Sequence, residues 1–129
     1  MEKKIILLDT SILIEYFRKT DKSKSQLFKL SANNQYTLAV SAITKFEIYN
    51  GINKQQEEFW NLFFNSIIVL PFEAETALIA SAIDADLKRK RKQIAIPDLF
   101  IAATAVQANC KIATHNKKHF ERIEKLKLV

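Results

Sequence analysis

Short apolar runs recur along the chain, and longer segments with a helical spacing of apolar side chains separate them. The first run, Ile5 to Leu8, contains no polar residue, which is typical of a strand buried on both faces of a sheet. Later apolar runs and stretches rich in β-branched and aromatic residues are about as long as this first run, so they are also expected to be strands. We predict strands at 4–8, 36–40, 67–70 and 111–114, and, in the last segment, a helical turn followed by an edge strand at 125–129.

The segments between these runs are expected to be helices. Ser41 is a good N-cap, and Gly51, the only glycine, suits the position just after the C-terminus of the helix that Ser41 begins. Pro97 and Asp98 begin a helix that is apolar on every side, as a helix at the centre of a fold is. We predict helices at 10–17, 23–32, 42–51, 54–65 and 73–91, and one that begins at 97.

Strands that alternate with helices predict an α/β fold with a mainly parallel central β-sheet and helices on both faces. The chain has no linker, repeat or low-complexity tract, so residues 1–129 are expected to form a single domain. In such sheets the functional crevice lies at the carboxyl ends of the strands. Asp9, Asp98, His115 and Asn116 stand at such positions, so we expect them to meet on one rim.

The composition excludes several classes of protein. Of the 129 residues, 48% are hydrophobic and 26% are charged, which suffices for a buried core in a globular domain. The single cysteine, Cys110, excludes an internal disulfide and a cysteine-based zinc site, and it fits a reducing compartment, so we expect a cytoplasmic protein. One glycine cannot build a glycine-rich phosphate loop. No run has the length of a signal-peptide core or a membrane span, so we expect no membrane partner.

The charge favours a polyanionic partner. The chain carries 20 lysines and arginines against 14 acidic residues, a net charge of +6, and the basic residues gather at 18–29, at 88–92 and after 110. The alternative is that these basic residues only cover solvent-exposed surface and helix C-termini, where cations complement the helix dipole. The residues that we expect to contact the polyanion are Lys88, Arg89, Lys90, Arg91, Lys92, Lys117 and Lys118.

Three acidic residues stand where a solvated carboxylate is not expected. Asp9 directly follows the first apolar run, and Asp98 opens the central apolar helix. Glu47 comes four residues after Ile43 and so shares the apolar stripe of its helix. The structural alternatives are helix caps for Asp9 and Asp98 and a buried salt bridge for Glu47.

Three carboxylates around one pocket repel one another unless a cation compensates them. Mg²⁺ and Mn²⁺ prefer oxygen ligands and suit phosphate substrates, so Asp9, Glu47 and Asp98 are candidate metal ligands and catalytic residues. Zinc fits less well, because His115 and His119 lack the glutamate of a His-Glu-x-x-His motif.

The segments that contain these acids resemble the motifs of PIN-domain ribonucleases, especially toxins of the VapC type. The matching segments are 6–14 with Asp9, 41–51 with Glu47 and 96–105 with Asp98, in the order found in the family. The resemblance extends over essentially the whole chain. It implies a PIN-like fold and a Mg²⁺- or Mn²⁺-dependent endoribonuclease that hydrolyses RNA phosphodiester bonds and leaves 5′-phosphate and 3′-hydroxyl ends. It also implies a homodimeric toxin of a type II toxin-antitoxin system, with a small antitoxin protein as partner.

The fourth motif, at 113–120, departs from the family pattern. Asn116 stands where aspartate is common, and His119 stands where an acidic residue often precedes the phenylalanine. Asn116 can still offer a carbonyl oxygen, so it stays a catalytic candidate, and we expect one firmly held ion. Thr10 and Thr114 are candidates for hydroxyls that support the metal ligands; for Thr114 the alternative is plain strand propensity.

Two other functions stay open at this point. One is a catalytically weak or inactive PIN-fold domain that binds RNA or another protein, which Asn116 and His119 favour. The other is a phosphatase in which Asp9 is the nucleophile. The residues after Asp9 lack the glycine of that motif, so the phosphatase carries little weight.

Four aromatic residues are candidates for contacts outside the core. Trp60 and Phe64, four residues apart on a predicted helix, are the best candidates for a protein contact. Tyr16 and Phe17 are candidates for stacking on RNA bases. The alternative for all four is a place in the hydrophobic core.

Overall fold

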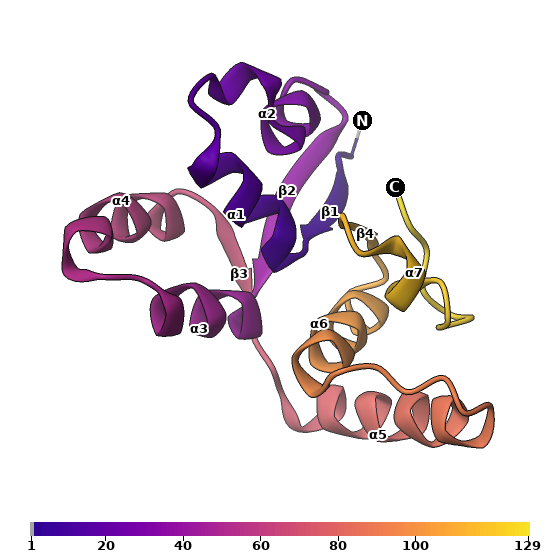
Figure 1. Ribbon diagram of the computed structural model, residues 1–129. Helices are drawn as coiled ribbons and strands as arrows, with labels where there is room; N and C mark the ends of the chain where they lie inside the picture. The colour runs from indigo at the N-terminus through magenta and orange to yellow at the C-terminus, as the bar shows by residue number, and fades with distance from the viewer. Residues whose placement is uncertain (1) are drawn as a thin grey trace.

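The structure, a computed structural model, describes residues 2–129 and has an α/β architecture (Figure 1). Its strands are β1 (Lys4–Leu8), β2 (Tyr36–Ser41), β3 (Ile68–Leu70) and β4 (Lys111–Ala113). Its helices are α1 (Thr10–Arg18), α2 (Gln26–Ser31), α3 (Ala42–Gly51), α4 (Lys54–Asn65), α5 (Ala74–Arg89), α6 (Ile96–Gln107) and α7 (Lys117–Phe120), with a short 3₁₀ turn at Lys22–Lys24.

The four strands form one sheet in the order β3-β2-β1-β4, and every pairing is parallel. The predicted mainly parallel sheet is therefore confirmed. The chain builds outward from β1 through β2 to β3 and then crosses to the other side of β1 for β4, so the strand order reverses between β1 and β4. A crevice at the carboxyl ends of the strands is expected at such a reversal. The expected edge strand at 125–129 is reduced to a single bridge between Ile112 and Leu128.

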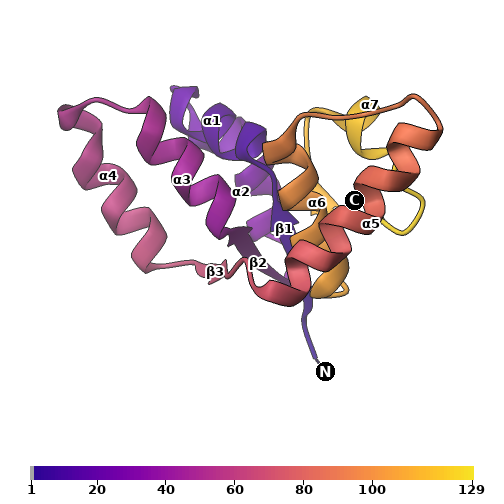
Figure 2. The same cartoon turned by 90° about the horizontal axis from the view of Figure 1, so that it is seen from below.

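Helices cover both faces of the sheet, as predicted. Successive strand side chains point to opposite faces, so Ile6 and Leu8 belong to one buried cluster and Leu7 to another. The first cluster packs beneath α1 to α4, and the second beneath α5, α6 and the C-terminal segment. Figures 1 and 2 show these two groups of helices on either side of the strands.

Helix α6 is the central helix that its apolar sequence predicts. Leu99 and residues 101–105 are buried, and a proline near its first turn begins the helix. The helix is kept central by contacts with the sheet on one side and α5 on the other. Within residues 2–129, no helix combines the length and the apolar character that crossing a bilayer requires.

The C-terminal ends of three helices differ from the pattern predicted for Gly51, in which a glycine follows the last helical residue. Ser41 caps α3 as expected, because its hydroxyl accepts from the Thr44 amide at 3.0 Å. Gly51, however, is the last residue of α3 and does not adopt a positive φ. The left-handed positions that end α5 and α6 are taken by Arg91 (φ 55°) and Asn109 (φ 53°). Helix α5 therefore ends before 91.

The protein contact predicted for Trp60 and Phe64 is wrong. Both residues are buried, with 1% and 5% of their surface exposed, and they pack on the sheet. Their rings lie within 5.9 Å of one another, and Phe17 lies 5.4 Å from Trp60. Tyr16 is half-buried against Phe59, 6.3 Å away. These side chains pack α1 against α4. Their place is therefore in the hydrophobic core, which was the alternative interpretation.

Candidate acidic site at the carboxyl edge of the sheet

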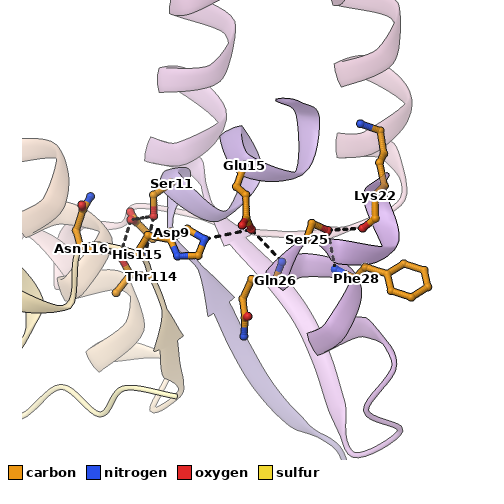
Figure 3. A network of polar contacts seen from close by, with 10 residues as sticks. All are labelled: Asp9, Ser11, Glu15, Lys22, Ser25, Gln26, Phe28, Thr114, His115 and Asn116. Atoms are coloured by element: carbon orange, nitrogen blue, oxygen red, sulfur yellow. Dashed lines mark hydrogen bonds and ion pairs between the residues drawn. The ribbon is translucent and has the colours of Figure 1, made fainter. Parts of the chain in front are cut away.

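Asp9 lies where β1 ends and α1 begins, beside the end of β4. It is only 2% exposed, and its backbone amide donates to the Ala113 carbonyl at 2.9 Å. The side chain does not cap α1. Instead, its Oδ2 atom accepts hydrogen bonds from Ser11 Oγ and Thr114 Oγ1, both at 2.8 Å (Figure 3). The helix-cap alternative for Asp9 is therefore wrong, and no side chain of residues 2–129 donates a hydrogen bond to Oδ1.

Thr114 joins Asp9 to the loop after β4. Its hydroxyl donates to Asp9 and accepts from the Asn116 amide at 2.9 Å. Ser11 Oγ likewise accepts from the His115 amide at 3.1 Å. The hydroxyl groups of Ser11 and Thr114 thus connect the Asp9 carboxylate to the start of α1 and to the loop after β4, which are far apart in the sequence. Thr114 therefore contacts Asp9 directly, and its support of a metal ligand stays a prediction.

Glu47 projects from α3 toward the start of α1. Its Oε1 atom accepts from Thr10 Oγ1 at 2.7 Å, and Thr10 also lies 3.0 Å from the hydroxyl of Thr44. Burial raises the pKa of Glu47, and the negative charges of Asp9 and Asp98 raise it further. In residues 2–129, no lysine, arginine or histidine forms an ion pair with Glu47, so the structure gives it no salt bridge.

Asp98 stands in the first turn of α6, and no side chain caps that helix. Burial raises the pKa of Asp98, and the charge of Asp9 adds to the effect. His119 opposes the shift, because its Nδ1 atom lies 3.6 Å from Asp98 Oδ2. The structure thus brings the histidine of the fourth motif to the carboxylate of the third.

The three carboxylates form an acidic centre, defined here as Asp9, Glu47 and Asp98. The charges of Asp9 and Asp98 raise the pKa of Glu47, and the charge of Asp9 raises the pKa of Asp98, as expected for neighbouring carboxylates; His119 is the basic group paired with them among the described residues. One oxygen each of Asp9 and Glu47 is held by hydroxyl donors. The remaining oxygens, and a negative charge that His119 offsets only at Asp98, suit a hard divalent cation. Across residues 2–129, no group of three or more histidine, cysteine, aspartate or glutamate side chains is already arranged to hold a metal ion.

The predicted residues of the fourth motif lie beside this centre. Asn116 is exposed at the start of α7, and its side chain does not cap that helix. A hollow of about 420 Å³ is lined by residues 114–119, which include Asn116, Lys117 and Lys118. Lys118 also lines a neighbouring hollow with Arg91, Lys92 and Arg122. We call Arg91, Lys92, Lys118 and Arg122 the basic track.

The basic residues at 88–92 differ in whether they form ion pairs. Lys88 pairs with Asp84 at 2.9 Å, and Arg89 pairs with Asp86. Lys90 contacts both Asp86, at 3.0 Å, and Glu124, at 2.6 Å. Arg91 and Lys92 form no ion pair in the part of the chain that the structure describes, and they are the members of the run that line the basic track.

The sequence-based reasoning missed Glu15 and Ser11. Glu15 Oε1 accepts from the Gln26 amide at 2.9 Å and lies 3.1 Å from His115 Nε2 (Figure 3). The amide hydrogen bond lowers the pKa of Glu15. Glu15 therefore joins α1, the start of α2 and the loop after β4. The spacing of Ser11 and Glu15, four residues apart on α1, was the signal that could have marked this face.

Comparisons with known proteins agree with the fold and the motifs. The PIN domain family matches residues 6–126 of the chain. Ribonuclease VapC1 of Methanocaldococcus jannaschii is 36% identical over 128 residues, which cover 98% of this chain and 87% of that protein. The tRNA(fMet)-specific endonuclease VapC of Shigella flexneri is 31% identical, over 91% of this chain and 90% of that protein.

A solved structure shows the same similarity in three dimensions. The crystal structure of VapBC2 from Rickettsia felis, bound to a DNA fragment from the promoter, contains a chain with a TM-score of 0.85 to this one. The two chains are 28% identical, and the match covers 97% of each. With the match to the family over residues 6–126, these similarities show that the chain belongs to the PIN domain family, among the VapC ribonucleases.

Proposed function

We propose that residues 1–129 form a single nuclease domain that acts as a Mg²⁺- or Mn²⁺-dependent endoribonuclease. The observation that carries the proposal is the acidic centre: three carboxylates at the carboxyl ends of the strands, where the charges of Asp9 and Asp98 raise the pKa of Glu47 and the charge of Asp9 raises the pKa of Asp98, in a chain of net charge +6. A protein that only binds RNA would gain affinity by losing these acids. Three acids in a basic protein are explained if they bind a cation that compensates their charge.

Asp9, Glu47 and Asp98 would hold the ion through oxygens that the hydroxyl groups leave free. A bound divalent ion supplies a water of lowered pKa and neutralises charge on the scissile phosphate. The role of Thr10, Ser11 and Thr114 is to fix the carboxylates by their other oxygens. One carboxylate of the centre orients or deprotonates the attacking water.

Asn116 and His119 limit the number of metal ions that the site binds. Asn116 brings an uncharged oxygen at the rim, and His119 offsets part of the charge of Asp98. We therefore propose one firmly held ion, with a second only where the substrate phosphate supplies further ligands.

The RNA is proposed to run along the basic track and past Lys117. Lysine and arginine contacts to phosphates give affinity that falls with salt and carries little sequence choice. The relatives act on RNA according to their names, and one is specific for tRNA(fMet). A structured RNA with exposed single-stranded bases is the substrate class that fits.

The partner proposed for this chain is a small antitoxin protein, bound to a toxin that forms a homodimer. The similar solved structures are VapBC toxin-antitoxin assemblies, such as the one from Rickettsia felis. We propose that the protein acts in the cytoplasm, where the free thiol of Cys110 stays reduced.

Cleavage of a structured RNA tests the proposal. Wild-type protein and Asp98→Asn would be incubated with tRNA in Mg²⁺, in Mn²⁺ and in chelator. The proposal expects cleavage by wild type in either metal, none in chelator, and a loss of at least about a hundredfold in Asp98→Asn. Equal cleavage by the two proteins, or in chelator, would contradict it.

The second candidate function is a PIN-fold domain that binds RNA without cutting it. The uncharged Asn116 and the His119–Asp98 contact of 3.6 Å favour it. RNA binding by wild type, with no cleavage in either metal, would establish this candidate in place of the nuclease.

A further inference from the structure

A third charged hollow lies at the amino ends of the strands, at the end of the sheet opposite the acidic centre. It has a volume of about 520 Å³ and is lined at the amino ends of β1, β2 and β4, near the N-terminal end of the ribbon in Figure 1. Five lysines surround it, and no acidic residue lines it: Lys3, Lys4, Lys111, Lys125 and Lys127. We call this the lysine hollow.

The five ammonium groups have no partner within the described residues. None of the five forms an ion pair, and no Nζ atom among them donates a hydrogen bond to residues 2–129. Five positive charges around one hollow repel one another. An anion that enters the hollow would relieve this repulsion.

The C-terminal end of α6 does not account for these lysines. Cations are often found near a helix C-terminus because they satisfy its free carbonyls. Here the backbone itself does so: the Ala108 amide donates to the Thr104 carbonyl at 3.0 Å, and the Cys110 amide donates to the Ala105 carbonyl at 3.0 Å. The lysines remain free for a ligand from outside.

The lining indicates a nucleic acid in preference to a protein. The cores of protein interfaces are depleted in lysine, and the charges of this hollow are all lysines. Lysine is a common phosphate ligand, and a charged groove beside an aromatic ring is typical of single-strand binding. Tyr36 supplies a half-buried ring, and Asn33, Gln35 and Asn109 add polar side chains to the lining.

We propose that the lysine hollow is a second RNA contact, which binds the phosphate backbone of a single-stranded segment. The choice of RNA as ligand rests on the proposed function. Five residues of β1 separate the two edges by about 17 Å at the rise of a strand. One RNA chain can span that distance, so the hollow would anchor RNA whose other part lies at the acidic centre.

Binding by a protein that does not cut tests the hollow separately from catalysis. In an Asp98→Asn background, Lys4, Lys111 and Lys127 would be changed together to Gln. The probe is a fluorescein-labelled 30-nucleotide polyuridylate, and the readout is anisotropy over a range of salt. We expect affinity to fall about tenfold or more, and the slope of log affinity against log salt to decrease by about 2, because three phosphate contacts are lost.

Two matched variants control this experiment. Lys24, Lys29 and Lys54 changed together to Gln remove the same charge from exposed positions elsewhere, and should lower affinity by less than about threefold. Lys4, Lys111 and Lys127 changed together to Arg keep the charge and should bind as tightly as the parent. Thermal unfolding of each variant checks the fold.

Two results would overturn the inference: equal losses of RNA affinity in the two Gln variants, or no loss in the hollow variant. If the hollow variant keeps its RNA affinity but loses binding of labelled polyglutamate that the parent shows, the hollow is assigned to an acidic protein segment instead. None of these results depends on cleavage. A wild-type protein that fails to cut RNA would contradict the proposed function and leave this measurement intact.

Discussion

At the scale of the residue, hydroxyl groups organise the acidic centre. Ser11 and Thr114 hold one oxygen of Asp9, and Thr10 holds one oxygen of Glu47. The acids could be predicted from sequence, because each stands at an unusual place in the hydrophobic pattern. The spacing from Ser11 marks the face of α1 that carries Glu15, but the contact of Glu15 with His115 could not be predicted, since the two residues are 100 positions apart.

Thr114→Val tests the support that this hydroxyl gives to Asp9. We expect RNA cleavage to fall about ten- to a hundredfold, because Asp9 loses a donor and the Asn116 amide loses its acceptor. Unfolding by urea should show a loss of about 1–2 kcal/mol. The control is Thr104→Val, another buried threonine, whose hydroxyl donates within α6 to the Phe100 carbonyl. It should alter stability and leave cleavage unchanged; equal losses of cleavage would contradict the role of Thr114.

Glu47→Gln tests the electrostatics of the metal-free centre. The pKa of Glu47 is raised in the folded protein, so the protonated form stabilises the fold at low pH and this stabilisation is lost as the pH rises through the folded pKa. Gln can accept the Thr10 hydrogen bond without the charge. In chelator we expect Glu47→Gln to be more stable than wild type at pH 7, by about 1 kcal/mol or less, and the difference to vanish near pH 4.

Thermal unfolding against pH measures this difference. The exposed Glu58→Gln on α4 is the control and should show no comparable dependence on pH. A Glu47→Gln protein that is less stable than wild type at pH 7 would show that Glu47 is compensated in the metal-free protein.

At the scale of the element, most strands and helices follow from hydrophobic pattern and caps. Their order and the parallel sheet are those expected, and Ser41 begins α3 as predicted. The failures have physical causes. The pattern of α4 shows which residues are apolar but not which side faces the sheet, so Trp60 and Phe64 were placed outside when they are inside. Arg91 ends α5 in a conformation that is usual for glycine, which no propensity rule predicts.

Trp60→Ala tests the aromatic packing that holds α4 to α1. Trp60 contacts Phe17, Phe59 and Phe63 with ring centres within 5.5 Å. Its loss should cost about 3–5 kcal/mol of unfolding free energy, measured by urea denaturation followed by circular dichroism. Phe46→Ala on α3, where the residue is 64% exposed, should change stability by less than about 0.5 kcal/mol. Similar costs for the two would mean that Trp60 is not a core residue.

At the scale of the whole molecule, the net charge of +6 is unevenly placed. The acidic centre occupies the carboxyl edge of the sheet, the basic track lies beside it, and the lysine hollow lies at the amino edge. Sequence predicts the clusters, and the helical spacing of Asp84 and Asp86 from Lys88, Arg89 and Lys90 already indicates local ion pairs. Only the fold shows the contact of Lys90 with Glu124, and that Arg91 and Lys92 form no ion pair within residues 2–129.

This division predicts unequal roles in RNA binding. Arg91, Lys92 and Lys118 changed together to Gln should weaken RNA binding about tenfold or more and reduce its salt dependence. The same change at Lys88, Arg89 and Lys90 removes equal charge from already paired groups, and its effect should be several times smaller. Anisotropy with labelled tRNA in an Asp98→Asn background measures both. The reverse order would show that the run at 88–90 is the contact.

The acidic centre as a divalent-metal site is tested most directly by titrating Mn²⁺ into the protein at pH 7 in a calorimeter. We predict about one ion per wild-type chain, and affinity at least about tenfold weaker in both Glu47→Gln and Asp98→Asn. Asp84→Asn, an acid paired with Lys88 on α5, should bind as wild type does. Mn²⁺ binding that is the same in wild type and Asp98→Asn, or that is lost equally in Asp84→Asn, would contradict the metal site.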